Sequence, residues 1–178
     1  DRAWALDAAT GQRDATFPLT TGQRGTHDWG FIACTDDLLI GSSVPVGAQF
    51  KDFWGKAMWF DKAGDPTATA VVCSDNVFAY NKQDASGLWA YGRGLVINST
   101  ITIADDRIWF VESRPPEAVR PAEGRVTGNV LWDHAHVVCL DNRTGTVVWE
   151  QPLNGLSDPS AVAHLQHEKS FVQVAYGA

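Results

Sequence analysis

The sequence lacks the cysteine patterns that hold haem or paired-cysteine centres. Its 178 residues contain three cysteines, and no C-x-x-C pair or C-x-x-C-H motif lies among them. Cys34, Cys73 and Cys139 each lie in a stretch with the composition of a β-strand. We therefore expect buried free thiols, with one disulfide and one remaining thiol as the alternative.

The sequence also lacks long apolar runs and an excess of positive charge. No apolar stretch reaches the roughly 18 residues that a membrane-spanning helix needs. Acidic residues outnumber Lys and Arg by 21 to 14, so the formal net charge is −7. Such a chain does not offer the basic surface that nucleic-acid phosphates require. P-loop, G-x-G-x-x-G and Ser-His-Asp patterns are absent too. The sequence thus predicts neither a membrane span nor a nucleic-acid partner.

The stretch 136–153 combines two strand patterns with a tight turn. Residues 137–140 are apolar and rich in β-branched side chains, which favours a strand. Residues 141–145 then supply an Asp that accepts backbone hydrogen bonds and a Gly that permits positive φ. Because side chains alternate along a strand, Val147 and Trp149 are predicted to share one face. Burial of the Trp149 indole would then contribute about 3–5 kcal/mol.

This hairpin pattern recurs along the chain. Residues 5–11 match residues 139–145 at four of seven positions, and Ala15 stands where the later copy has Trp149. Residues 79–89 form a looser copy, whose turn is predicted to be two residues longer and to end at Gly87. The residues expected to serve this repeat structurally are Asp7, Gly11, Gly87, Trp89, Trp109, Asp141, Thr144, Gly145 and Trp149.

A second pattern of strand, acidic turn and strand alternates with the first. It covers 31–41 and 101–111, with a weaker copy at 163–172. Self-similarity of long period with four short strands per unit indicates propeller blades. The predicted fold is all-β, a β-propeller segment of about three four-stranded antiparallel blades. Its predicted parts are a half blade at 1–17, blades at 28–92 and 95–153, and a half blade at 160–176.

A family resemblance follows from the repeat. Ala-Leu-Asp-Ala-Ala-Thr-Gly at 5–11 and Leu-Asp-Asn-Arg-Thr-Gly-Thr-Val-Val-Trp at 140–149 resemble the repeat of pyrroloquinoline-quinone-type (PQQ-type) β-propellers. That group includes quinoprotein alcohol dehydrogenases and an outer-membrane assembly lipoprotein. The pattern is fairly specific for the fold and poorly specific for activity, since enzymes and scaffolds share it. The resemblance covers most of the chain outside two long inserts, and it implies a periplasmic or secreted protein.

The number of predicted blades raises the question of ring closure. About three blades do not close a ring, because closed propellers have roughly four to eight. The chain has no initiator Met or signal peptide and begins partway through a repeat, so we expect an excerpt of a longer precursor. The alternative is a homo-oligomer in which copies of the chain complete the ring.

Two long inserts, at about 43–70 and 113–133, leave both complete blades at the same face. Loops on a rigid frame often carry function, although these would also serve to cover blade edges. A His beside an Asp, as at 27–28, is a possible general base or ligand, and a capped turn explains it equally well. The candidate residues for partner or ligand contact are His27, Asp28, Trp29, Phe53, Trp54, Trp59, Arg114, Trp132 and His134.

Metal binding and catalysis receive less support from the sequence. Asp133, His134 and His136 come closest to a metal-ligand set, but nothing nearby completes it. The resemblance implies that family enzymes hold their quinone with a stacking Trp, an adjacent cysteine pair and Ca²⁺, and this sequence has no adjacent cysteine pair. No catalytic residue is therefore assigned, and no cofactor is expected in this segment.

Two functions remain from these patterns. The first is a non-catalytic binding or scaffold module that presents loops to a protein or small-molecule partner. The alternative is part of a periplasmic PQQ-dependent alcohol dehydrogenase, which would need PQQ and Ca²⁺.

Overall fold

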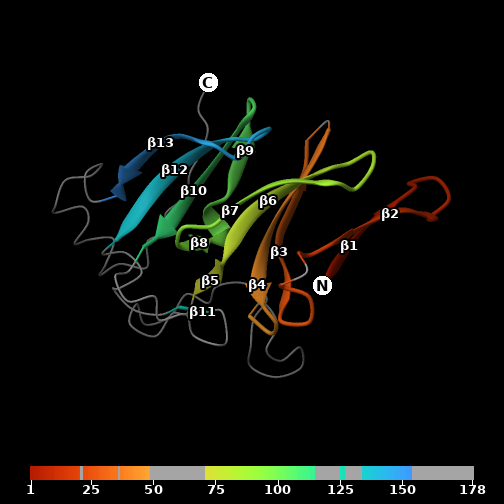
Figure 1. Ribbon diagram of the computed structural model, residues 1–178, viewed down its shortest axis with the longest axis horizontal. Coiled ribbons are helices and arrows are strands. Elements are labelled where there is room, and N and C mark those ends of the chain that lie inside the picture. Colours follow the sequence, from red (N-terminus) through yellow and green to blue (C-terminus); the bar gives the residue numbers. More distant parts are fainter. Residues whose placement is uncertain (21, 36, 49–70, 115–124, 127–133, 154–178) are drawn as a thin grey trace.

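The chain forms antiparallel β-sheets with one short 3-10 helix, in a computed structural model that describes residues 1–20, 22–35, 37–48, 71–114, 125–126 and 134–153 (Figure 1). The all-β class predicted from the sequence is confirmed. The predicted half blade at 160–176 lies outside the described residues, as do most of the two inserts. No helix in the described ranges is long and apolar enough to cross a membrane.

Three groups of strands follow one another along the chain. The first is a hairpin of β1 (Arg2–Leu6) and β2 (Arg13–Pro18). The second is a four-stranded meander of β3 (His27–Cys34), β4 (Leu38–Pro45), β6 (Asn76–Asn81) and β7 (Gly87–Tyr91). The third contains β8 (Leu95–Ile97), β9 (Thr102–Ala104), β10 (Arg107–Ser113), β12 (Ala135–Asp141) and β13 (Val147–Pro152).

Strands β8 and β9 together occupy one side of β10, because both pair with it. The 3-10 helix η1 (Asn98–Thr100) separates them. The Thr100 hydroxyl accepts a hydrogen bond from the Val111 amide at 2.8 Å and donates to the Ile97 carbonyl at 2.7 Å. A buried side chain thus replaces ladder bonds where the strand is interrupted.

The third group is larger than the separate four-stranded blade that the sequence predicts. Strand β5 (Val71–Ser74) pairs with β8, and β11 (Arg125–Val126) pairs with β5, so the sheet has seven strands. Asp75 alone separates β5 from β6, and its amide donates to the Ser43 carbonyl at 2.9 Å. The chain therefore passes from one sheet to the other at Asp75. No hydrophobic pattern in the sequence predicts this change of sheet.

The three groups pack as layers, with the meander in the middle. Alternate residues of β4 and β6 face opposite sides. Leu39 and Phe78 lie in a cluster with Phe17 of the hairpin, whereas Ile40 lies in a cluster with Phe110 of the third group. The central strands β4 and β6 of the middle sheet are thus buried on both faces, and the main core lies between this sheet and the seven-stranded sheet.

The three predicted hairpins share one register, including the looser copy. Each turn begins at a residue that makes two backbone hydrogen bonds: Asp7, Asn81 or Asp141. The amide of this residue donates a hydrogen bond across the turn, and its carbonyl accepts one from the amide of the residue four positions later. That later residue has positive φ and is Gly11, Ala85 or Gly145. The prediction that Gly87 ends a longer turn is therefore wrong: Ala85 takes the glycine position at φ 57°, and Gly87 begins β7.

A register shift interrupts each hairpin just before the turn. In the third hairpin, Cys139 pairs with Trp149 and Leu140 pairs with Val147, so Val148 is the extra residue of a β-bulge. The bulge shifts the alternation, which places Val147 against the core and leaves Trp149 43% exposed. The prediction that Val147 and Trp149 share a buried face is therefore wrong.

Trp89 occupies the same register position as Trp149 but packs between the sheets. Its Nε1 donates to the Asn142 carbonyl at 3.0 Å. A Cβ added at Gly145 would lie 2.5 Å from its ring, so the indole rests directly on that turn. Trp89 thus joins the middle sheet to the β12–β13 turn of the next.

The three cysteines are free in the structure. Cys73 and Cys139 are buried, as predicted. Cys34 is exposed, which corrects the expectation for that residue: it is the last residue of β3, where the strand ends at a turn.

Candidate functional site

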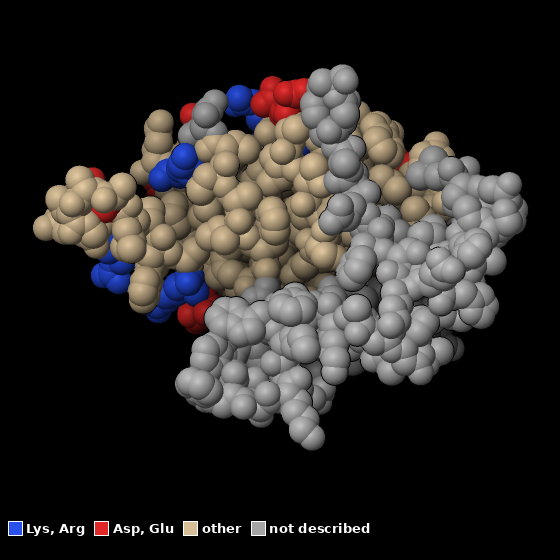
Figure 2. Space-filling model, turned by 180° about the vertical axis from the view of Figure 1, so that it is seen from behind, with Lys and Arg blue, Asp and Glu red and all other residues tan. Residues whose placement is uncertain are grey.

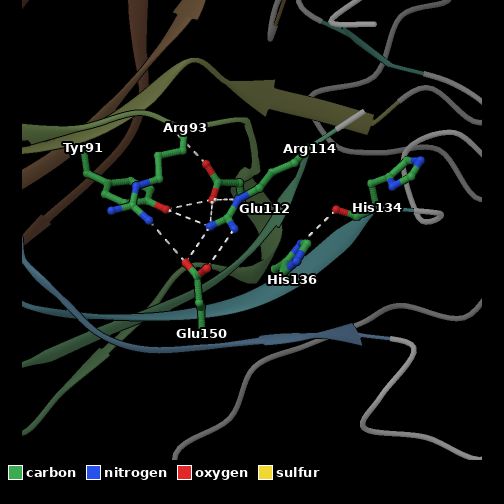
Figure 3. A network of polar contacts seen from close by, with 7 residues as sticks. All are labelled: Tyr91, Arg93, Glu112, Arg114, His134, His136 and Glu150. Carbon is green, nitrogen blue, oxygen red and sulfur yellow. Dashed lines mark hydrogen bonds and ion pairs between the residues drawn. The ribbon is translucent and has the colours of Figure 1, made fainter. Parts of the chain in front are cut away.

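A network of charged side chains lies where β7, β10 and β13 come together (Figure 3). At its centre, Glu112 is completely buried. Its Oε2 accepts hydrogen bonds from Tyr91 Oη at 2.8 Å and Arg114 Nε at 3.0 Å, and its Oε1 accepts the Arg93 amide at 3.1 Å. A buried carboxylate is stable here because both of its oxygens are paired.

Arg114 bridges this buried carboxylate to a second one nearer the surface. Its two terminal nitrogens donate to the two oxygens of Glu150 at 3.1 and 2.9 Å, which is the bidentate geometry of a strong ion pair. Arg93 adds a weaker contact, with Nη1 3.4 Å from Glu150 Oε2 and its guanidinium over the Tyr91 ring. The two negative charges of the Glu side chains are therefore matched by the two positive charges of the Arg side chains.

The pKa shifts in the network make its side chains less suited to acid–base catalysis near neutral pH. The hydrogen bond with Glu150 raises the pKa of Arg114 further, and the same bond lowers the pKa of Glu150. Burial, followed by the charge of Glu112, raises the pKa of Tyr91. Each of these three groups thus moves away from the range in which a general acid or base works. The arrangement is suited to locking strands together.

The network lies at the base of the second long insert. Arg114 follows β10 directly, and its amide donates to the His134 carbonyl at 3.1 Å on the returning chain. His136 Nδ1 also contacts that carbonyl, at 3.0 Å. Of the predicted loop residues, Arg114 is therefore fixed by ion pairs, whereas His134 is exposed. No group of three potential metal ligands occurs in the described part of the chain.

The predicted candidates at 27–29 do not converge on one site. His27 Nε2 contacts Asp75 Oδ2 at 2.8 Å, and its Nδ1 contacts the neighbouring Thr26 hydroxyl at 2.9 Å. Asp28 Oδ1 instead accepts a hydrogen bond from the N-terminal ammonium nitrogen of Asp1 at 3.2 Å. Trp29 packs edge-on against Phe78 beside the hairpin. Both His27 nitrogens therefore have partners.

The remaining predicted candidates lie outside the described residues: Phe53, Trp54, Trp59 and Trp132. The sequence patterns do not single out Tyr91, Arg93, Glu112 or Glu150. For Glu112 a signal exists, because it follows the apolar run Ile108–Val111 inside a strand, where an ionised side chain needs a buried partner. Tyr91 and Glu150 carry no such signal.

Comparisons with known proteins do not extend this picture. No family model matches the sequence, and no curated protein is significantly similar to it.

Proposed function

We propose that the chain is a segment of a PQQ-type repeat β-propeller that serves as a non-catalytic binding or scaffold module. The observation that carries the proposal is the contact of Trp89 with the turn at Asn142 and Gly145 of the next sheet. The same register in three hairpins supports it, because a propeller is built by repeating one sheet and one contact between sheets. Further blades, from the same protein or from other copies, complete the ring in this proposal.

The topology directs both long connections to one end of the sheets. Strand β4 ends at Pro45 and β10 ends at Ser113, and both run in the same sense within their meanders. The hairpin turns, including those at 105–106 and 141–145, occupy the opposite end. The long connections are thus the segments presented to a protein or small-molecule partner, as loops on rigid frames commonly are. Export to the periplasm or cell exterior belongs to the same proposal.

Site-specific photo-crosslinking tests which end meets a partner. A benzophenone amino acid replaces exposed His134, beside the long connection, or exposed Ala9, in a hairpin turn. We expect a discrete adduct from position 134 and none from position 9. The captured protein is then purified, and its Kd for the chain should rise in Trp54→Ala or Trp132→Ala while Tm stays unchanged. Equal capture at both positions, or Kd and Tm changing together, contradicts the proposal.

Quinone binding separates the module from the dehydrogenase alternative. The chain is titrated with PQQ in the presence of Ca²⁺, and alcohol-dependent dye reduction is measured in parallel. The module hypothesis predicts no saturable change in near-ultraviolet absorbance and no dye reduction. Saturable quinone binding with alcohol oxidation would establish the dehydrogenase and reject the module.

A further inference from the structure

The exposed Trp149 lies at the strand position of a residue that joins two sheets elsewhere in the chain. It pairs with Cys139 across β12 and β13, as Trp89 pairs with Ala79 across β6 and β7. Trp89 reaches from the middle sheet to the Gly145 turn of the next sheet. The equivalent register directs Trp149 away from the middle sheet, where 43% of the residue is exposed. Trp149 is thus placed to join the seven-stranded sheet to a further layer.

The β1–β2 turn is a copy of the turn on which Trp89 lies. In both turns, the first aspartate accepts hydrogen bonds from the amide and the hydroxyl of the threonine three residues later. Gly11 has the positive φ of Gly145, 72° against 68°. A Cβ added at Gly145 would lie 2.5 Å from the Trp89 ring, whereas one added at Gly11 meets nothing within 4 Å. The Gly11 turn therefore has the shape that receives an indole, and it is open.

The residues that meet between neighbouring layers are complementary in size. Trp89 lies on Gly145, where an added Cβ would clash with the ring. Ala15 stands at the tryptophan position of the first hairpin, and it packs in the same cluster as Ala85, which stands at the glycine position of the next turn. An indole is thus found with glycine and a methyl group with alanine. By this rule Trp149 requires a glycine turn, and the first hairpin has one.

The outer face of the first hairpin repeats a face that is buried in the third hairpin. Val138 and Leu140 are fully buried in the core shared with the middle sheet. Trp4 and Leu6 stand at the same positions relative to the turn aspartate, but they are 62% and 57% exposed. They face away from the middle sheet, because Ala5 between them packs toward it. Large apolar side chains exposed together in this way mark an interaction surface.

The two surfaces lie at opposite ends of the stack of layers (Figure 1). The middle sheet contacts the first hairpin on one face and the seven-stranded sheet on the other. One chain therefore cannot place Trp149 on its own Gly11 turn, but two copies can do so head to tail. With three layers in each copy, two copies give about six, within the roughly four to eight blades of a closed propeller, and three copies give too many.

We propose that a second copy of this chain docks head to tail through these surfaces and forms a dimer. Trp149 of one copy lies on the Gly11 turn of the other, and its Nε1 donates to the Ala8 carbonyl, as Trp89 donates to the Asn142 carbonyl within the chain. The outer face of the hairpin packs beside this indole. The inference rests on the propeller arrangement proposed above and specifies which chain supplies the neighbouring layers.

Sedimentation velocity over a concentration series measures the association of the whole chain. The wild type should pass from monomer to dimer between about 1 μM and 1 mM. Trp149→Ala should raise the Kd of the dimer by about thirtyfold, which is typical of a tryptophan anchor at an interface. Trp149→Phe keeps a ring but lacks the Nε1 donor, so its Kd should lie between those of the wild type and Trp149→Ala.

A glycine pair tests the receiving turn. Gly11→Ala should raise Kd by at least tenfold, because the added Cβ occupies the place of the ring. Gly25→Ala is the matched control: its φ is 81° and an added Cβ meets nothing within 4 Å. Gly25 precedes β3, at the end of the sheets opposite the hairpin turns, so this variant carries similar strain and should leave Kd unchanged.

A mixture of the two defective variants distinguishes lost contact from misfolding. Trp149→Ala retains the glycine turn and Gly11→Ala retains the tryptophan, so an equimolar mixture has one intact contact. We expect a 1:1 heterodimer at concentrations where each variant alone is a monomer. Far-ultraviolet circular dichroism checks that each variant is folded.

The outcomes are distinct. Dimerisation that is weakened by Trp149→Ala and by Gly11→Ala, and restored when the two are mixed, supports the proposal. A wild-type chain that stays monomeric at about 1 mM, an unchanged Kd in Trp149→Ala, an equal loss in Gly25→Ala, or a mixture without heterodimer overturns it. These failures leave the propeller segment in place, because that proposal fails separately, if Trp89→Ala is no more destabilising than Trp149→Ala.

Discussion

Trp89 and Trp149 show how one residue type at one register position acquires two different roles. Trp89 meets the turn of the next sheet, whereas Trp149 is 43% exposed in the last described sheet. We therefore expect Trp89→Ala to lower the free energy of unfolding by about 3–5 kcal/mol, and Trp149→Ala by less than about 1 kcal/mol. Urea unfolding followed by circular dichroism measures both.

A third variant separates packing from hydrogen bonding at this position. Trp89→Phe keeps a ring between the sheets but loses the bond from Nε1 to the Asn142 carbonyl, so it should lie between the wild type and Trp89→Ala. Equal losses for Trp89→Ala and Trp149→Ala would show that Trp89 does not join the sheets.

Gly145 and Gly11 permit a matched test of the same contact. Both have positive φ, at 68° and 72°. An added Cβ at Gly11 meets nothing within 4 Å, whereas at Gly145 it lies 2.5 Å from the Trp89 ring. Gly11→Ala should therefore cost only the strain of the left-handed conformation, about 1–2 kcal/mol. Gly145→Ala should cost about 1–3 kcal/mol more because of the clash.

The double variant Trp89→Ala/Gly145→Ala identifies the cause of the difference. Once the indole is absent, the cost of adding Cβ at position 145 should fall to that at position 11, as a double-mutant cycle in urea detects. Additive effects of the two substitutions would place the extra cost elsewhere than in the indole.

At the scale of single residues, the sequence predicts the turn conformations better than it predicts whether the tryptophans after the turns are buried. Asp7 and Asp141 accept the backbone and hydroxyl bonds of Thr10 and Thr144, as Asp-x-x-Thr-Gly indicates. These bonds lower the pKa of Asp7. The predicted alignment of the second hairpin is wrong because Ala85, and not a glycine, holds the positive-φ position of its turn. Whether a tryptophan is covered depends on the next sheet, and a local pattern does not contain that information.

At the scale of elements, buried charge joins strands that apolar contacts alone would leave free to slide. Arg114 lies between Glu112 on β10 and Glu150 on β13 and donates hydrogen bonds to both (Figure 3). Tyr91 on β7 donates its own hydrogen bond to Glu112. Ion pairs of this kind fix register, because every oxygen and guanidinium nitrogen must keep its partner. The cost of breaking them is high, since a lone buried carboxylate remains.

The Tyr91 hydroxyl gives this network a pH dependence in alkaline solution. Burial, then the charge of Glu112, raises its pKa above the ordinary value of 10.0. Its contribution is fully present below that unfolded value and is lost as pH rises through the folded pKa, because the unfolded chain releases the proton first. Above pH 10 the wild type should lose up to about 1.4 kcal/mol per pH unit through this group.

Comparison with Tyr91→Phe isolates this effect. The variant lacks the bond to Glu112 and should be less stable at neutral pH, but the gap should narrow from about pH 10 upward. Unfolding free energies in guanidinium chloride across this range provide the measurement. A gap that stays constant or widens with pH would contradict the assigned direction.

Strand positions follow from the sequence more readily than strand partners do. The strand–turn–strand patterns at 31–41 and 101–111 correspond to β3–β4 and β9–β10, because alternation and turn residues are local signals. The crossing of β5 into the next sheet and the Thr100 interruption depend on contacts distant in sequence. The charged network also depends on contacts between residues distant in sequence. The one local signal for it is Glu112, a charged residue within an apolar strand.

For the whole molecule, layering determines which parts open together. Ile40 and Val77 of the middle sheet share a core with Phe110 and Val138 of the seven-stranded sheet. The β1–β2 hairpin is two-stranded and meets only the other face of the middle sheet, through Phe17 and its neighbours. Figure 2 shows that charged side chains of the described part keep to the margins of the rear face, leaving its middle uncharged. Two sheets around one core form a cooperative unit, and the hairpin is an appendage.

Native-state hydrogen exchange tests this division. Amides of β4 and β12 should exchange with the same free energy of opening, equal to that of global unfolding, while those of β1 and β2 open at lower cost. Tyr80 donates its hydroxyl to the Pro18 carbonyl at the end of β2. Tyr80→Phe should therefore lower the opening free energy of the hairpin by about 1 kcal/mol and change β12 little. Separate opening energies for β4 and β12 would mean that the shared core and Trp89 do not couple the sheets, and the propeller proposal would lose the contact on which it rests.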